Sequence, residues 1–124
     1  MSLPKLFSPV KIGHLEIKNR IAMAPMGTMG MVNPDGSLKP TVIDYYAERA
    51  KGGAGLIITG ITQVERKIVN MPKRSIPLMF WNDASSYGEL AERAHAFGCK
   101  VFIQLTAGFG RVSRPQYLED APVS

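Results

Sequence analysis

Residues 19–30 read Asn-Arg-Ile-Ala-Met-Ala-Pro-Met-Gly-Thr-Met-Gly, and this stretch decides the fold that the sequence predicts. Its apolar run is typical of a strand buried on both faces, which we expect over residues 20–24. Pro25 ends the strand, because proline has no N–H group to give to a sheet ladder. The glycines after it let the backbone approach a ligand closely. A buried parallel strand that ends in a loop of small residues is where α/β proteins place their ligands.

Two more apolar runs follow at residues 55–59 and 99–105, and a helical pattern precedes each of them. The first helix should begin at Pro40, since proline suits the first position of a helix, and should end at the Gly52-Gly53 pair. The second should open near Ser86 and close at Gly98. Helical spacing assigns the inner face of the first helix to Val42, Tyr45, Tyr46, Arg49 and Ala50.

The order strand–helix–strand–helix–strand predicts an α/β fold with a parallel sheet, and right-handed crossovers place both helices on one side. A short β-hairpin over residues 3–18, turning at Gly13-His14, should precede it. A Rossmann half needs its glycine-rich turn directly after the first strand, whereas Gly53-Ala54-Gly55 precedes the second strand. The N-terminal part of a TIM (β/α)8 barrel fits better. A whole barrel takes about 250 residues, so residues 1–124 would form an incomplete barrel segment with about three of eight units.

Composition excludes several classes of function. The formal charge of +5 comes from scattered basic residues, which indicates a solvated surface and not a nucleic-acid interface. We expect no membrane span, because no apolar run approaches twenty residues, and we see no secretory signal. The single cysteine, Cys99, excludes an intramolecular disulfide and favours a reducing, cytoplasmic location. His14 lies in a turn with no other metal-type side chain near it in sequence, and His95 lies on the second helix, away from the strand ends, so no metal site is expected.

Four short motifs, taken as an ordered set, resemble the opening of the Old Yellow Enzyme family. They are Leu6-Phe7-Ser8-Pro9, Ile12-Gly13, Asn19-Arg20-Ile21 and Ala24-Pro25-Met26. The chain is most similar to the group that holds 2-enoate reductases and 2,4-dienoyl-CoA reductases. The resemblance implies a flavin-dependent ene-reductase on a TIM barrel, in which the hairpin plugs the bottom of the barrel.

Gln104 is the most informative polar residue, because it lies near the C-terminal end of an apolar strand. Its amide offers a donor and an acceptor together, which suits the edge of a flavin pyrimidine ring. From position alone, a structural glutamine that bonds loop backbone is an equal alternative. The resemblance favours the first interpretation, because Gln-Leu at the end of the third strand is the flavin-reading glutamine of the family.

The resemblance also assigns cofactor contacts to backbone. Ala24, Pro25, Met26 and Gly27 match the segment that lines the isoalloxazine ring, and Ile61 matches a small residue whose main chain touches the ring. Several relatives carry Thr or Cys at the place of Gly27, so side-chain tuning of the flavin there is absent or comes from Thr28. Arg111 matches the arginine that ends the family's third-strand motif, but the motif, Gln104 to Arg111, is one residue longer here and lacks the family's histidine. A surface arginine is the alternative interpretation.

The function implied by the resemblance is hydride transfer from NADH or NADPH, through FMN, to the C=C bond of an α,β-unsaturated carboxylate or acyl thioester. The full-length protein would also hold FAD and a 4Fe–4S cluster, as the enoate reductase group does. Its catalytic acid and phosphate-binding loops would follow residue 124, so no catalytic residue is named here and the 124-residue piece alone should be inactive. Made alone, the piece would have an unpaired strand edge, so we expect it to form a multimer or an aggregate. A homo-oligomer is a separate expectation for the full-length protein. The alternatives are a structural barrel fragment without activity and another TIM-barrel enzyme with a non-flavin ligand.

Overall fold

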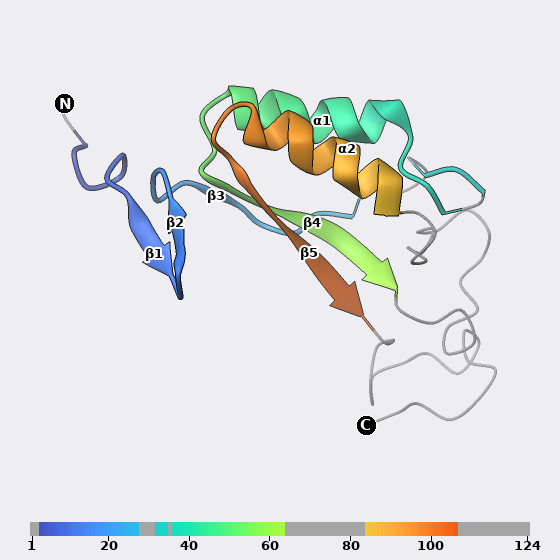
Figure 1. The fold of residues 1–124 in the computed structure, drawn as a ribbon, viewed down its shortest axis with the longest axis horizontal. Helices are drawn as coiled ribbons and strands as arrows, with labels where there is room; N and C mark the ends of the chain where they lie inside the picture. The colour runs from blue at the N-terminus through green and yellow to red at the C-terminus, as the bar shows by residue number, and fades with distance from the viewer. Residues whose placement is uncertain (1–2, 28–31, 35, 64–83, 107–124) are drawn as a thin grey trace.

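The computed structural model describes residues 3–27, 32–34, 36–63 and 84–106 of the chain. In these residues an N-terminal hairpin, β1 (Val10–Ile12) and β2 (Leu15–Ile17), precedes the strand β3 (Ala22–Met23). The helix α1 (Pro40–Lys51), the strand β4 (Leu56–Gln63), the helix α2 (Ala84–His95) and the strand β5 (Lys100–Thr106) follow. Figure 1 shows the hairpin standing apart from the layer of strands that the two helices cover.

The sheet confirms the predicted topology. Its strands lie in the order β3-β4-β5, and both pairings are parallel. Both helices lie on the same side of the sheet (Figure 1). The hairpin is antiparallel, with Ile12 opposite Leu15, and the turn between them places Gly13 at a φ of 58°. A positive φ favours glycine, which explains why the turn falls there.

Several predicted boundaries are wrong by a few residues. β3 is shorter than expected, β5 begins one residue later than Cys99, and β4 continues past Thr59 as far as Gln63. α2 begins at Ala84, before Ser86, and the Ser86 hydroxyl accepts a hydrogen bond of 3.1 Å from the Leu38 N–H. The serine therefore holds the segment before α1 against α2, which local sequence spacing does not indicate.

The core lies between the helices and the sheet, and one side of α1 supplies much of it. Ile43 and Ala47 are buried on α1, whereas Arg49 is exposed and Tyr45 is half-buried. The predicted inner face was therefore wrong in part, because α1 packs against α2 as well as against the sheet. The buried cluster consists of Leu38, Val42, Ile43, Tyr46, Ala50, Ala54, Ile57, Leu90, Ala94 and Cys99.

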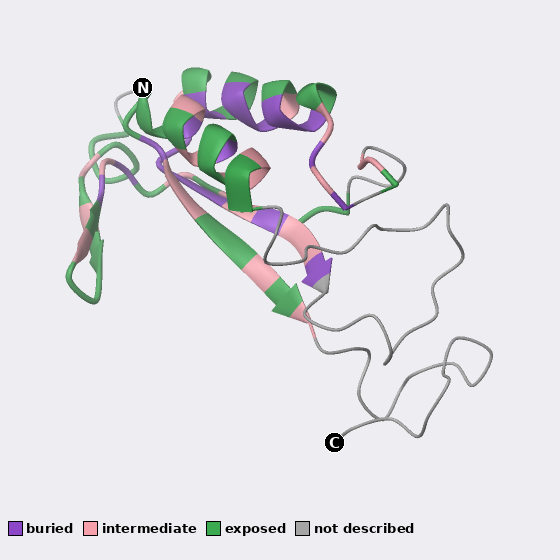
Figure 2. Ribbon diagram, turned by 45° about the vertical axis from the view of Figure 1, so that its right-hand side comes forward, coloured by how far each residue is buried: buried purple, intermediate pink, exposed green. Residues whose placement is uncertain are grey.

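β5 departs from the expectation of a strand buried on both faces. Phe102, Ile103 and Leu105 are 36%, 38% and 60% exposed. Figure 2 shows the contrast between the buried inner side of α1 and the largely uncovered β5. β5 is an edge strand of this sheet, and within the described residues no further strand pairs with its outer side. None of the described helices is long and apolar enough to cross a membrane.

Asn19 fastens the start of β3 to the start of β4. The side chain is 7% exposed; its Nδ2 donates to the Gly53 carbonyl at 2.8 Å, and its Oδ1 accepts from the Ile21 N–H at 3.1 Å. Gly55 lies directly beneath it, so that a β-carbon there would collide with the Asn19 side chain and come within 3.0 Å of Ile17 Cγ2. The buried amide needs both partners, and it needs the space that glycine leaves.

We predict that Gly55→Ala lowers the free energy of unfolding by about 1–3 kcal/mol, the usual cost of overpacking a close contact. Urea unfolding measures this loss. Gly88→Ala is the matched control, because Gly88 lies within α2 with nothing within 4 Å of a β-carbon placed on it. It should leave stability unchanged or raise it by up to about 1 kcal/mol. Equal effects of the two substitutions would contradict the role given to Gly55.

Candidate cofactor site

The carboxyl ends of parallel strands meet at one edge of a sheet, and those predicted site residues that the structure describes lie there. Gln104 in β5 is the direct partner of Ile61 in β4. The loop after β3 lies against β4 as well, because a β-carbon on Gly60 would collide with the Met26 carbonyl and lie 3.3 Å from Gly27 Cα. The structure thus brings three separate segments of the chain together.

Most of the predicted site residues lie at this edge of the sheet. The segment of Ala24, Pro25, Met26 and Gly27, the residue Ile61 and the residue Gln104 lie at this common edge. Thr28 and Arg111 lie outside the described residues. The contacts of Arg111 with a cofactor therefore stay a prediction.

A β-bulge in β4 decides which way the site residues face. Ile58 pairs with Phe102 and the next pair is Ile61 with Gln104, so β4 has one residue more than β5 between the two pairs. An extra residue reverses the alternation of side chains along a strand. Ile57, before the bulge, belongs to the core beneath the helices. Ile61 after it is therefore turned to the opposite face, the face of Gln104.

Thr62 confirms the reversal. Its hydroxyl lies 2.9 Å from the Tyr87 hydroxyl of α2, which places Thr62 on the helix side together with Ile57. In a regular strand, residues 57 and 62 would face opposite sides. The apolar run in the sequence predicts a strand that ends at Thr59, which leaves the bulge unpredicted. Gly60, a glycine inside an apolar run, was the available signal, because such a glycine often marks a bulge or a close backbone approach.

Hydrogen bonds hold the bulge on both sides. The Gly60 N–H donates to the Tyr46 hydroxyl at 3.0 Å, and the Thr59 hydroxyl donates to the Gly60 carbonyl at 3.2 Å. The same Thr59 oxygen accepts from the Gln104 N–H at 3.3 Å. Tyr46 is 2% exposed, and this burial raises the pKa of its phenol, an effect that the bond from Gly60 partly offsets. The phenol therefore stays neutral at ordinary pH.

The donor set at this edge fits a flat ring with a polar margin. Gln104 is half-buried, and within the described residues its side-chain amide has no hydrogen-bond partner. Met26 is 57% exposed, and a β-carbon on Gly27 would meet nothing within 4 Å. The Gln104 amide, which has no partner among the described residues, thus lies at the same sheet edge as the open, uncharged surface of Met26 and Gly27. Such a surface suits an isoalloxazine face, and the amide suits a pyrimidine edge that both donates and accepts.

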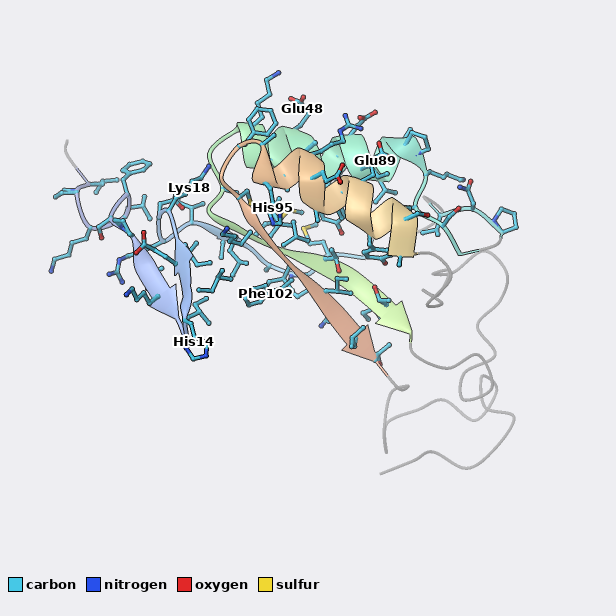
Figure 3. The ribbon with its side chains drawn as sticks, viewed as in Figure 1. His14, Lys18, Glu48, Glu89, His95 and Phe102 are labelled. Atoms are coloured by element: carbon cyan, nitrogen blue, oxygen red, sulfur yellow. The ribbon has the colours of Figure 1, made fainter. Side chains whose placement is uncertain are left out.

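The charged side chains of the described residues lie away from this edge. Figure 3 shows His14 at the tip of the hairpin, Glu48 and Glu89 on the helices, and His95 at the end of α2 that leads into β5. Arg93 pairs with Asp44 at 2.5 Å and with Glu89 at 3.5 Å, which joins the helices on their outer side. The described residues contain no cluster of three metal-type ligands. The described groups at this edge that could bind and orient a ligand are therefore uncharged.

Residues 5–124 match the NADH:flavin oxidoreductase / NADH oxidase family. The chain belongs to this family. Within it, the chain is 49% identical over 122 residues to a cinnamate reductase of Clostridium sporogenes, covering 96% of this chain and 18% of that protein. It is 40% identical over 116 residues to an NADH oxidase of Thermoanaerobacter brockii, covering 94% and 18%.

Solved structures of Old Yellow Enzymes share the fold. The Old Yellow Enzyme homologue from Zymomonas mobilis superposes with a TM-score of 0.71 at 31% identity, over 89% of this chain and 30% of that one. Morphinone reductase in complex with tetrahydroNAD gives 0.71 at 30% identity, over 89% and 29%. The chain therefore has the fold of the N-terminal part of an Old Yellow Enzyme barrel. It spans between about a fifth and a third of the length of these NADH:flavin oxidoreductase relatives.

Cys99 is buried, and this burial raises the pKa of its thiol. We expect iodoacetamide at pH 8 to alkylate Cys99 at least about tenfold more slowly in the native protein than in urea. Each unit of raised pKa removes about nine-tenths of the reactive thiolate, and burial also blocks access. Mass spectrometry of the labelled peptide follows the rate. Equal rates with and without urea would show a reactive thiol and contradict this assignment.

Proposed function

We propose that this chain is the N-terminal part of a flavin-dependent ene-reductase. The complete protein would take hydride from NADH or NADPH and pass it, by way of FMN, to the C=C bond of an α,β-unsaturated carboxylate or acyl thioester. The observation that carries the proposal is the meeting of Gln104, Ile61 and the 24–27 segment at one sheet edge, in a chain of the NADH:flavin oxidoreductase family. Hydride transfer is the chemistry that FMN supplies when bound, and the protein supplies its orientation.

Each part of the edge has a role in this proposal. The backbone of Ala24, Pro25, Met26 and Gly27 forms a wall for the ring, and the main chain of Ile61 contacts it. The Gln104 amide bonds the pyrimidine edge with a donor and an acceptor. Gly27 brings no side chain to the ring, so electronic tuning at that point would rest on backbone or on Thr28. Arg111 would add a positive charge to the same site.

The substrate class is a proposal that the cinnamate reductase relative supports, because that protein's name describes the reduction of an unsaturated acid. FAD and a 4Fe–4S cluster in the complete protein, a cytoplasmic location and a homo-oligomer also stay proposals. The described residues contain one cysteine, which is buried, so cluster ligands would have to come from elsewhere. A structural fragment without activity is the second candidate, and the exposed apolar side chains of β5 favour it for the 124-residue chain alone.

One anaerobic experiment tests these proposals. The complete protein should be yellow, NADH or NADPH should bleach its flavin absorbance, and cinnamate or a cinnamoyl thioester should restore it. The acceptor that reoxidises the flavin faster shows whether the substrate is the free acid or the thioester. The purified 124-residue chain, assayed beside it, should remain colourless, because it offers the ring a single wall and one edge. A complete protein that is reduced but is reoxidised by neither acceptor would overturn the ene-reductase assignment.

Gln104→Ala in the complete protein should weaken FMN binding by about 1–3 kcal/mol, because the bond partners on the ring would be left unpaired. Titration of the apoprotein with FMN measures the change. Lys100→Ala is the control, because Lys100 lies at the opposite end of β5, away from the proposed site. Wild-type affinity in Gln104→Ala would remove the glutamine from the site and favour its structural interpretation.

A further inference from the structure

We propose that Tyr46 and Thr59 are positioning residues for the flavin site, although neither is placed to touch the ring. This inference rests on the proposed function. Tyr46 belongs to α1 and is 2% exposed, and Thr59 is 3% exposed within β4. Both bond the backbone of the same residue, Gly60, from opposite ends.

Their effect follows from the planarity of the peptide group. The Gly60 N–H is held by the Tyr46 hydroxyl, and the Gly60 carbonyl is held by the Thr59 hydroxyl. With both polar ends of a glycine fixed, the peptide that joins it to Ile61 has little freedom to rotate. That peptide carries the Ile61 N–H, so the two hydroxyls set the direction of the main chain that the proposed function gives to the ring.

The same two residues reach the other contacts of the site. The Thr59 oxygen accepts from the Gln104 N–H, which ties the backbone of the flavin-reading glutamine to the bulge. The Met26 carbonyl lies against Gly60, so the loop after β3 rests on the peptide that Tyr46 and Thr59 hold. All three segments of the site therefore depend on one short piece of backbone.

A structural role for a buried tyrosine would appear in stability alone. A positioning role also appears in the bound flavin, because a ring that meets a displaced peptide has a changed electronic environment. The distinction is measurable when the protein is saturated with FMN, where any loss of affinity no longer matters. The visible absorption bands and the midpoint potential then report on geometry alone.

The test compares Tyr46→Phe with Tyr45→Phe in the complete protein. Each variant loses one hydroxyl from the same helix, but only Tyr46 bonds Gly60. Tyr46→Phe should raise the FMN dissociation constant and the exchange rate of the Gly60 amide about three- to tenfold each, the effect of one lost hydrogen bond. It should also shift the flavin bands and midpoint potential at saturation. Tyr45→Phe should match the wild type in all four measurements.

Should Tyr46→Phe fail to fold, Thr59→Val and Thr59→Ser form an equivalent pair, because serine keeps the hydroxyl and valine removes it. Thr59→Ser should restore the flavin spectrum that Thr59→Val loses. Unchanged bands and potential in Tyr46→Phe and Thr59→Val, or equal losses in both tyrosine variants, would overturn the inference. A wild-type protein that binds no FMN would overturn the proposed function and this inference with it, and the Gly60 exchange rate would still report whether Tyr46 holds the bulge.

Discussion

The single extra residue in β4 is the constraint on which the candidate site depends. Before the bulge, Ile57 faces the helices, and after it Thr62 does, so the bulge turns Ile61 to the face of Gln104. Without it, the continuous alternation of a strand would direct Ile61 into the core beneath α2. The bulge in turn needs a glycine, because the Met26 carbonyl fills the space of a side chain at Gly60. Packing and site geometry are therefore fixed by the same residue.

The fold was predictable because each of its main signals is local. The apolar runs of β4 and β5, Pro40 at the start of α1 and the glycines after it predict parallel β/α units without reference to distant contacts. The places where prediction failed involve contacts that cross the chain. The face of α1 includes Ile43 and Ala47 because α2 packs beside it, and Ser86 bonds Leu38 over a long separation in sequence. Periodicity within one helix contains no information about such partners.

The candidate site divides in the same way. Gln104 was recognisable as an amide at the end of an apolar strand, and Ala24 to Gly27 by the proline and glycines that end one. The bulge and the two side chains that hydrogen-bond to it were not recognisable, because Thr59 is an ordinary strand residue and Tyr46 is an ordinary residue for an amphipathic helix. A tyrosine on a helical stripe is most simply interpreted as core. Only the position of its hydroxyl, 3.0 Å from the Gly60 nitrogen, distinguishes it from any other buried aromatic residue.

A site built mainly from backbone has a consequence for how function can vary within such a fold. Side chains at Ala24, Met26 and Ile61 can change without moving the peptide groups beside them, provided that the backbone path is kept. Changes at Tyr46, Thr59 or Gly60 would alter that path and leave every proposed ligand contact chemically intact. Free energy of about 1 kcal/mol, the worth of one net hydrogen bond, is enough to alter an equilibrium about fivefold. In the proposed site, residues that never touch the ring, Tyr46 in the helix layer and Thr59 in the sheet, would therefore influence it through the backbone.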